Sequence, residues 1–178
     1  MDLIDAIRAR RSVRTFDGTS LGPALLGELS DYAGSLENPF HIPIEFRVLD
    51  ADEHGLSSPV ILGARTYVAA KVVRQPHAEE AFGYAFERLI LHATSLGLGT
   101  VWLAGTIDRP AFERAMEVGE DEVMPAVSPI GHAAPKRSVR ESAMRRALRS
   151  DGRMAFGELF FENDFSSPLP MNEGGLNL

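Results

Sequence analysis

The sequence predicts an α+β or α/β fold built around a central sheet. Helical and strand-like periodicities alternate along the chain, and no segment repeats another. With 178 residues, of which 44% are hydrophobic and 24% charged, the chain can bury a sizeable core. We therefore expect one domain over residues 1–150. An extended arm or linker should follow over residues 151–178, where the sequence becomes polar and rich in Pro and Gly.

Two helices are predicted before the first strand. Asp2 can cap a short helix with three apolar side chains on one face. These side chains are Leu3, Ile4 and Ile7. A second helix is expected from about Pro23 to Tyr32, with Gly34 as its end.

Two strands and the longest helix follow. Residues 41–50 alternate between apolar and charged side chains, which predicts a half-buried strand. Residues 64–73 are rich in β-branched residues and predict a more buried strand. Residues 78–97 keep apolar side chains at helical spacing and reach Gly97, where a helix stop is expected.

The remaining elements are shorter. Residues 99–105 predict a strand that runs into a glycine-containing loop, and Asp108 can cap a helix over residues 108–118. Residues 124–134 predict another strand, in which two prolines indicate an edge position or a bulge, because proline cannot donate to a ladder. These prolines are Pro125 and Pro129. A last helix is expected over about Val139–Arg149.

Composition excludes several classes of function. A net charge of -7 argues against a general binder of nucleic acid or anionic membranes. The absence of cysteine excludes disulfides, thiolate metal sites and a catalytic thiol, and the five histidines lack metal-ligand spacing. We therefore expect no metal site. Because no signal-peptide pattern or membrane-length apolar run occurs, we also expect a cytoplasmic protein.

The arginine-rich stretch RRSVRTF (residues 10–16) is the first candidate binding site. In an extended chain, Arg10, Ser12 and Arg14 would project from one face. Two guanidinium groups and a hydroxyl form a clamp for a terminal phosphate, because arginine matches phosphate oxygens bidentately. Lys136 and Arg137, just after a predicted strand, can add to this charge. The alternative is that the arginines form surface ion pairs with nearby acids: Asp2, Asp5 and Asp17.

The loop at Ala104-Gly105 is the second candidate. It presents backbone N–H groups with almost no side chain to block a flat ring, since glycine permits close backbone approach. The alternative is a tight turn after a buried strand.

Together, RRSVRTF, GLGTVWLAGT and MPAVSPIGHAAPKRS resemble the FMN-dependent nitroreductase family, in its order and roughly its spacing. The resemblance implies an α+β fold with a central, mostly antiparallel sheet and a homodimer with FMN at the subunit interface. It implies that the FMN phosphate and ribityl chain contact Arg10, Arg11, Ser12 and Arg14, and that Ala104 and Gly105 offer backbone N–H groups to flavin N5. A basic residue after the last strand completes the phosphate site, with Arg137 the best match and Lys136 second.

The resemblance also implies an oxidoreductase that passes hydride from NAD(P)H, via the flavin, to a nitroaromatic, quinone or similar small-molecule acceptor. Such chemistry belongs mainly to the cofactor and needs no catalytic side chain. Arg14 is then the candidate for positive charge near flavin N1 and O2. Three aromatic residues either line the acceptor pocket or belong to the core: Trp102, Phe40 and Phe161.

One segment departs from the family pattern. Where members carry an APSxxNxQPW-type segment, this chain has YAGSLENPFHIPIEF, which lacks that motif. It resembles the TM nitroreductase subgroup, in which the motif stands in a second half and one chain folds as a pseudo-dimer. We therefore expect a fragment, or a shortened member that recruits its missing half from another subunit.

Two other functions stay open at this point. The missing motif favours a non-catalytic protein of the nitroreductase fold that binds flavin or a related ligand. The basic run over residues 136–153 is compatible with a nucleic-acid or acidic-partner surface, although a solvated helix face is the simpler interpretation.

Overall fold

The structure, a computed structural model, describes residues 2–147, 152 and 154–169. The chain divides into two compact units, Met1–Glu141 and Ser142–Leu178. The boundary predicted near residue 150 stays a prediction, as does the end of the last predicted helix, which lies outside the described residues.

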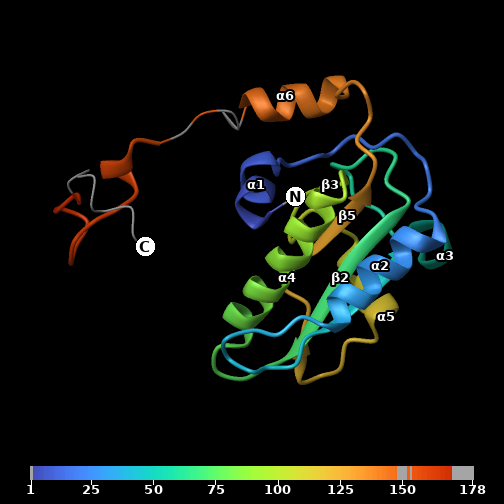
Figure 1. Cartoon of the computed structure of the whole chain (residues 1–178), viewed down its shortest axis with the longest axis horizontal. Helices are drawn as coiled ribbons and strands as arrows, with labels where there is room; N and C mark the ends of the chain where they lie inside the picture. The colour runs from blue at the N-terminus through green and yellow to red at the C-terminus, as the bar shows by residue number, and fades with distance from the viewer. Residues whose placement is uncertain (1, 148–151, 153, 170–178) are drawn as a thin grey trace. The chain divides into compact units, whose positions relative to one another are not determined.

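A five-stranded sheet forms the centre of the first unit (Figure 1). The strand order is β1-β2-β5-β3, and β4 pairs with β2. Its strands are β1 (Glu45–Asp50), β2 (Thr66–Val73), β3 (Gly99–Thr100), β4 (Glu122–Val123) and β5 (Val127–Gly131). Every pair of named strands is antiparallel, which confirms the predicted α+β fold with a mostly antiparallel sheet.

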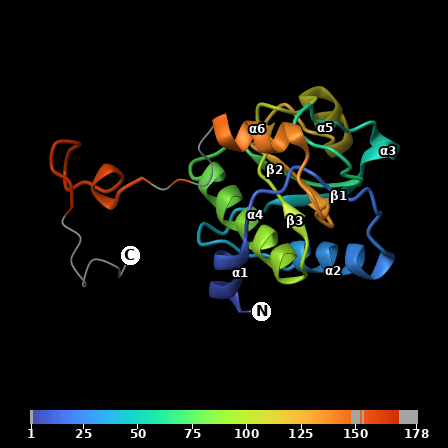
Figure 2. The same ribbon diagram turned by 90° about the horizontal axis from the view of Figure 1, so that it is seen from above.

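Helices cover both faces of the sheet. The helices are α1 (Leu3–Ala9), α2 (Pro23–Gly34), α3 (Ala51–His54), α4 (Ala78–Ser95), α5 (Arg109–Met116) and α6 (Val139–Ala147). Figure 2 shows α2 and α4 on one face and α5 on the other. Strand β2 therefore buries both of its faces: Val68 and Ala70 pack with α2 and α4, whereas Tyr67 and Ala69 pack with α5.

The predicted helix caps are confirmed at α1 and α5. The Asp2 carboxylate accepts a hydrogen bond from the Asp5 N–H at 2.8 Å, and the Asp108 carboxylate accepts one from the Ala111 N–H at 3.4 Å. Helix α2 departs from the prediction, because Gly34 lies inside the helix and Ser35 forms its C-cap.

Pro129 does not mark an edge strand, because β5 lies between β2 and β3. It interrupts one ladder instead. Leu103 and Val127 exchange both backbone hydrogen bonds, at 2.8 and 2.9 Å, so the next bonded pair in this register is Val101 with Pro129. Proline has no N–H to donate there. The Ser128 hydroxyl mediates the other bond of this pair: it accepts from the Val101 N–H at 3.1 Å and donates to the Pro129 carbonyl at 2.8 Å.

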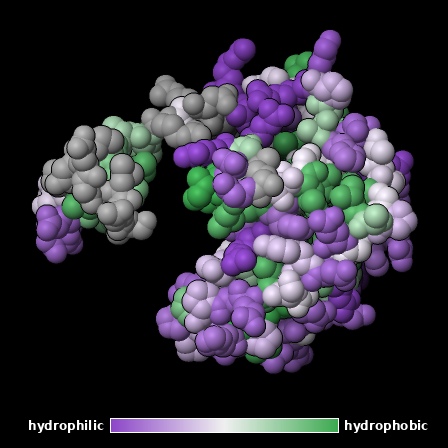
Figure 3. Space-filling view, in the orientation of Figure 1, coloured by the Kyte–Doolittle hydropathy of each residue, from purple (hydrophilic) through white to green (hydrophobic). Residues whose placement is uncertain are grey.

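The apolar face of α1 lies at the surface. Leu3, Ile4 and Ile7 are 54%, 54% and 52% exposed, and only Ala6 of this helix is buried. Figure 3 shows hydrophobic surface at the position of α1. The face predicted from the spacing exists, but it does not contribute to the core of this chain.

The second unit, where it is described, is a turn-rich segment. A 3₁₀ helix spans Phe156–Glu158, and the Phe156 ring stacks on Phe160 with centroids 4.5 Å apart. The Leu169 N–H donates to the Phe160 carbonyl at 3.0 Å. Phe165 is 90% exposed.

Candidate functional site

The stretch after α1 is extended and joins the sheet. Ser12 forms a parallel bridge with Thr100 of β3. Backbone hydrogen bonds tie the stretch to three distant parts of the chain: Val13 N–H to the Thr100 carbonyl (2.9 Å), Phe16 N–H to the Leu62 carbonyl (2.8 Å) and Ala134 N–H to the Thr15 carbonyl (3.0 Å). We call residues 12–17 the anchored segment.

Two glycines permit this close approach. A Cβ atom at Gly99 would lie 2.9 Å from three side-chain atoms of Val13. Gly63 has φ +77°, and a Cβ atom there would overlap the Phe16 carbonyl. The anchored segment therefore packs directly against the backbone on two sides.

Side chains alternate from Ser12 to Thr15 as an extended chain requires, whereas Arg11 is exposed. Val13 and Thr15 are buried, whereas Arg10, Ser12 and Arg14 are half-buried. The predicted separation of the polar side chains from the core-facing ones is therefore present.

The candidate basic residues differ in how far their charge is already compensated. The Arg10 Nε lies 3.6 Å from a Glu87 carboxylate oxygen, and the Arg137 Nε lies 3.9 Å from Glu141. Four candidate side chains make no hydrogen bond or ion pair with any described residue: Arg11, Ser12, Arg14 and Lys136. The alternative prediction was that the arginines form ion pairs with Asp2, Asp5 and Asp17. Among the described residues, only Arg8 forms such a pair, 3.9 Å from Asp5.

The loop after β3 is fixed through a backbone carbonyl and leaves two backbone N–H groups unbonded. The Ala104 carbonyl accepts a hydrogen bond from Arg109 Nη2 at 3.0 Å, and Arg109 Nη1 donates to the Met124 carbonyl at 2.8 Å. Ala104 and Gly105 are exposed, and their N–H groups donate to no described residue. This leaves two backbone N–H donors without a described acceptor, and their role toward a ligand stays a prediction.

Arg109 was not among the predicted site residues. Its position beside Asp108 identified only the start of a helix. Nothing in the spacing indicates that its guanidinium reaches back to Ala104.

Glu87 of α4 links the first stretch to this loop. One of its oxygens accepts a hydrogen bond from Trp102 Nε1 at 2.8 Å, and the other lies 3.6 Å from the Arg10 Nε. The Trp102 ring packs edge-on against Phe86, with centroids 4.6 Å apart. The first two predicted motifs therefore meet at one carboxylate.

The third motif meets the first through a buried polar cluster. The Thr15 hydroxyl donates to Glu141 Oε2 at 2.7 Å and accepts a hydrogen bond from the Ser138 N–H at 3.2 Å. The Ser138 hydroxyl accepts one from the Glu141 N–H at 3.1 Å, and Glu141 is only 4% exposed. Lys136 and Arg137 belong to the loop that this cluster fastens to the anchored segment.

The segment that departs from the family pattern forms a self-contained loop. The Asn38 side chain accepts hydrogen bonds from the N–H groups of Phe40 and Ile42, at 3.1 and 3.3 Å, and donates to the Ile42 carbonyl at 2.7 Å. Asn38 is 7% exposed. Its amide is therefore committed to the loop, and Phe40 stacks on His77 with centroids 5.1 Å apart.

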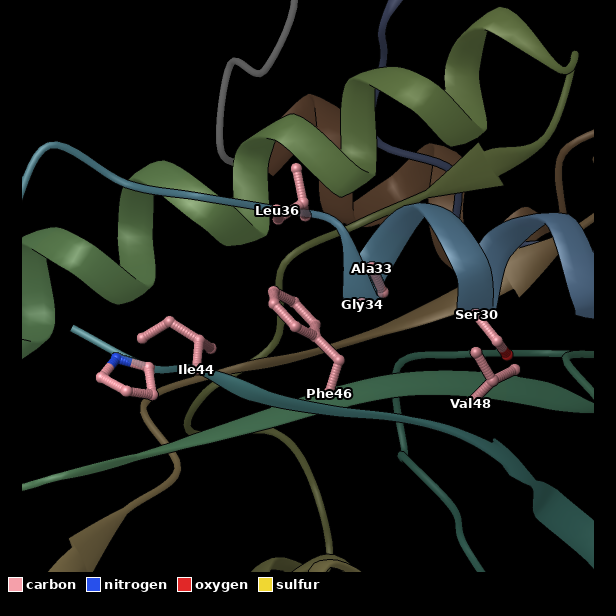
Figure 4. A pocket seen from close by; sticks show the side chains of 8 residues that line it. Ser30, Ala33, Gly34, Leu36, Ile44, Phe46 and Val48 are labelled. Atoms are coloured by element: carbon pink, nitrogen blue, oxygen red, sulfur yellow. The ribbon is translucent and has the colours of Figure 1, made fainter. Parts of the chain in front are cut away.

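A hollow of about 330 Å³, lined mainly by apolar residues, lies between α2 and β1 (Figure 4). Ala33, Gly34 and Leu36 line one side, and Ile44, Phe46 and Val48 line the other. No predicted site residue borders this hollow, and no basic side chain lines it. It does not suit a phosphate-bearing ligand.

No described helix has both the length and the apolar character to cross a bilayer. No group of three or more His, Asp or Glu side chains among the described residues is arranged to hold a metal ion.

A family model described as "Putative TM nitroreductase" matches residues 2–152. The chain belongs to this nitroreductase family. No curated protein sequence matches the chain.

Solved structures of this nitroreductase fold are similar at low identity. A nitroreductase family protein from Clostridium difficile 630 aligns with a TM-score of 0.69 and 14% identity, over 92% of this chain and 99% of that one. A nitroreductase with bound FMN from Bacteroides fragilis NCTC 9343 aligns with a TM-score of 0.62 and 19% identity, over 78% and 92%. An oxidised iodotyrosine deiodinase bound to FMN and 3-iodo-L-tyrosine aligns with a TM-score of 0.61 and 16% identity, over 77% and 92%.

Proposed function

We propose that this nitroreductase-family chain binds FMN at the convergence of its three motifs. The phosphate would be held by the basic stretch and the loop before α6: Arg10, Arg11, Ser12, Arg14, Lys136 and Arg137. Ala104 and Gly105 would hold the ring through their backbone N–H groups. The observation that carries this proposal is that the three motifs are linked by contacts at Glu87 and at Thr15. The candidate side chains and backbone N–H groups that bond no described residue belong to these linked motifs.

The charges suit a phosphate monoester. Glu87 and Glu141 offset Arg10 and Arg137, and three cationic side chains then have no described partner: Arg11, Arg14 and Lys136. A phosphate monoester carries about -1.5 to -2 charges at pH 7. These three side chains and the Ser12 hydroxyl match such a group in charge and in hydrogen-bonding type.

We further propose an NAD(P)H-dependent oxidoreductase. Bound FMN would supply hydride transfer from NAD(P)H to a nitroaromatic, quinone or similar acceptor. The chain's own part is to bind and orient: the loop at Ala104 and Gly105 offers fixed backbone dipoles, and Arg14 adds positive charge. Fixed dipoles and charges of this kind favour electron density on a ring held beside them.

A homodimer is part of the proposal. The exposed apolar face of α1, formed by Leu3, Ile4 and Ile7, supports burial against another subunit, since contiguous apolar surface commonly marks an interface. A cytoplasmic location remains a prediction from the sequence.

A non-catalytic flavin-binding protein of the same fold is the second candidate. It is favoured by the loop that lacks the family motif, because its buried Asn38 is hydrogen-bonded within that loop. Redox chemistry separates the two candidates. Under anaerobic conditions, NAD(P)H should bleach the yellow colour of an enzyme, and an acceptor should restore it.

Binding itself is tested by the visible spectrum of the purified protein, with the released chromophore identified by mass. Trp102 is the only tryptophan and stands two residues before Ala104, so added FMN should quench its fluorescence. The double variant Arg10→Ala/Arg14→Ala should lose FMN. A control that removes the same charge elsewhere, Arg8→Ala/Arg74→Ala, should keep it.

A colourless protein that also fails to bind added FMN would refute the proposal. Unchanged FMN content in the Arg10→Ala/Arg14→Ala variant would refute the assignment of the clamp.

A further inference from the structure

Ser138 and Glu141 form the N-terminal cap of α6, and the Thr15 hydroxyl is inserted between them. In a capping box, the N-cap side chain bonds the third helical N–H, and the glutamate at that third position reaches back to the N-cap N–H. Here Ser138 precedes α6 and its hydroxyl accepts from the Glu141 N–H at 3.1 Å. The return contact runs through Thr15, which accepts from the Ser138 N–H and donates to the Glu141 carboxylate.

This insertion couples two segments that are 123 to 126 residues apart. Thr15 belongs to the anchored segment and is 8% exposed, so its hydroxyl faces the cluster and not the solvent. Ser12 and Arg14 extend from the other face of the same segment. Lys136 and Arg137 immediately precede Ser138. The Thr15 hydroxyl therefore fixes the distance between the two halves of the phosphate clamp.

Glu141 adds an electrostatic restraint. A buried carboxylate is costly unless it is hydrogen-bonded and paired, and Glu141 has both the Thr15 hydroxyl and Arg137, whose Nε lies 3.9 Å from it. Arg137 makes no hydrogen bond with a described residue, so it retains donors for a second anion. The carboxylate holds one side of the guanidinium and leaves the remainder available.

We propose that Thr15 and Glu141 are positioning residues of the phosphate site: they hold the loop bearing Lys136 and Arg137 against the anchored segment, which bears Ser12 and Arg14. This inference rests on the proposed FMN function. It concerns the phosphate group alone, because the two residues act on both halves of the clamp and not on the loop at Ala104 and Gly105.

The test compares FMN with riboflavin, which has the same ring and ribityl chain but no phosphate. Dissociation constants are measured on flavin-free protein through Trp102 fluorescence. In Thr15→Val we expect FMN to bind at least about tenfold more weakly, the loss that follows when a hydrogen bond to a charged group is removed. Riboflavin binding should stay within about twofold, and Thr15→Ser, which keeps the hydroxyl, should resemble the wild type.

Glu141→Gln separates positioning from simple charge. Removal of a negative charge near a phosphate should tighten FMN binding if long-range electrostatics dominates. Positioning predicts weaker FMN binding instead, because the neutral amide no longer orders Arg137 and accepts a weaker hydrogen bond from Thr15. Matched controls are Thr94→Val, which removes a hydroxyl bonded within α4, and Glu122→Gln, which neutralises one of the two carboxylates paired with Lys71.

Each outcome supports or overturns the inference. A wild-type ratio of FMN to riboflavin affinity in Thr15→Val, equal losses for both ligands, or tighter FMN binding in Glu141→Gln would overturn the inference. If Thr15→Val fails to fold, Thr15→Ser and Glu141→Gln, which preserve the shape of the cluster, still decide it. Failure of the wild type to bind FMN would instead overturn the proposed function, a separately visible result.

Discussion

Replacement of Gly99 by alanine should place a methyl group where the anchored segment packs against β3. The new Cβ would lie 2.9 Å from Cβ, Cγ1 and Cγ2 of Val13. Val13 is 7% exposed and its N–H bonds the Thr100 carbonyl at 2.9 Å, so the side chain cannot withdraw without moving the backbone.

The cost can be bounded from these contacts. Overpacking of a filled site costs about 1–3 kcal/mol, and loss of the Val13 to Thr100 hydrogen bond adds about 1 kcal/mol if the segment shifts. For a chain of this size, each kcal/mol lowers the melting temperature by about 2–4 °C. We therefore expect Gly99→Ala to melt roughly 2–16 °C below the wild type.

Thermal unfolding followed by circular dichroism measures this loss. Gly83→Ala is the matched control, because a Cβ atom there meets nothing within 4 Å and alanine favours the helix. Val13→Ala removes two of the three close atoms, so its combination with Gly99→Ala should cost less than the sum of the single changes. A Gly99→Ala protein as stable as the wild type, or strictly additive losses, would refute the packing argument.

Three further outcomes are expected. Asp108→Ala should lower the free energy of unfolding by about 1 kcal/mol through loss of the α5 cap, measured by urea denaturation; an unchanged midpoint would contradict this. Arg109→Ala should speed amide hydrogen exchange in residues 103–108, because it frees the Ala104 carbonyl, whereas exchange in β2 should not change. Burial lowers the pKa of His92 below its ordinary value of 6.5, so the unfolded chain takes up a proton first as the pH falls. Stability should therefore decrease below about pH 6.5, and His92→Gln should remove that decrease in urea titrations at two pH values; an equal decrease in both proteins would contradict it.

Much of the fold could be predicted because local signals agreed with the tertiary structure. Asp2 and Asp108 cap the helices that they were expected to cap, and the apolar spacing of residues 78–97 gave α4. The place of Pro129 could not be predicted, because proline only excludes a donor on one side of a strand. Inside the sheet, the Ser128 hydroxyl accepts from the Val101 N–H and donates to the Pro129 carbonyl, so a side chain takes over part of the ladder.

The candidate site was harder to predict because its geometry is set by distant residues. The clamp hypothesis assumed an extended chain at Arg10–Arg14, but the pairing of this stretch with Thr100 and Leu62 has no local signal. Likewise, Glu141 appeared only as an acid within a basic run. Its burial against Thr15 depends on a contact across 126 residues.

During synthesis, the anchored segment is made long before the residues that it contacts. The anchored segment leaves the ribosome first, yet the carboxylate that Thr15 bonds is translated 126 residues later. At about 5–20 residues per second, this leaves the segment without that partner for roughly 6–25 s. During that interval Val13 and Phe16 have no core to enter, and the neighbouring arginines lie on an unstructured chain. The anchored segment is therefore exposed to chaperones and to polyanions before the fold closes around it.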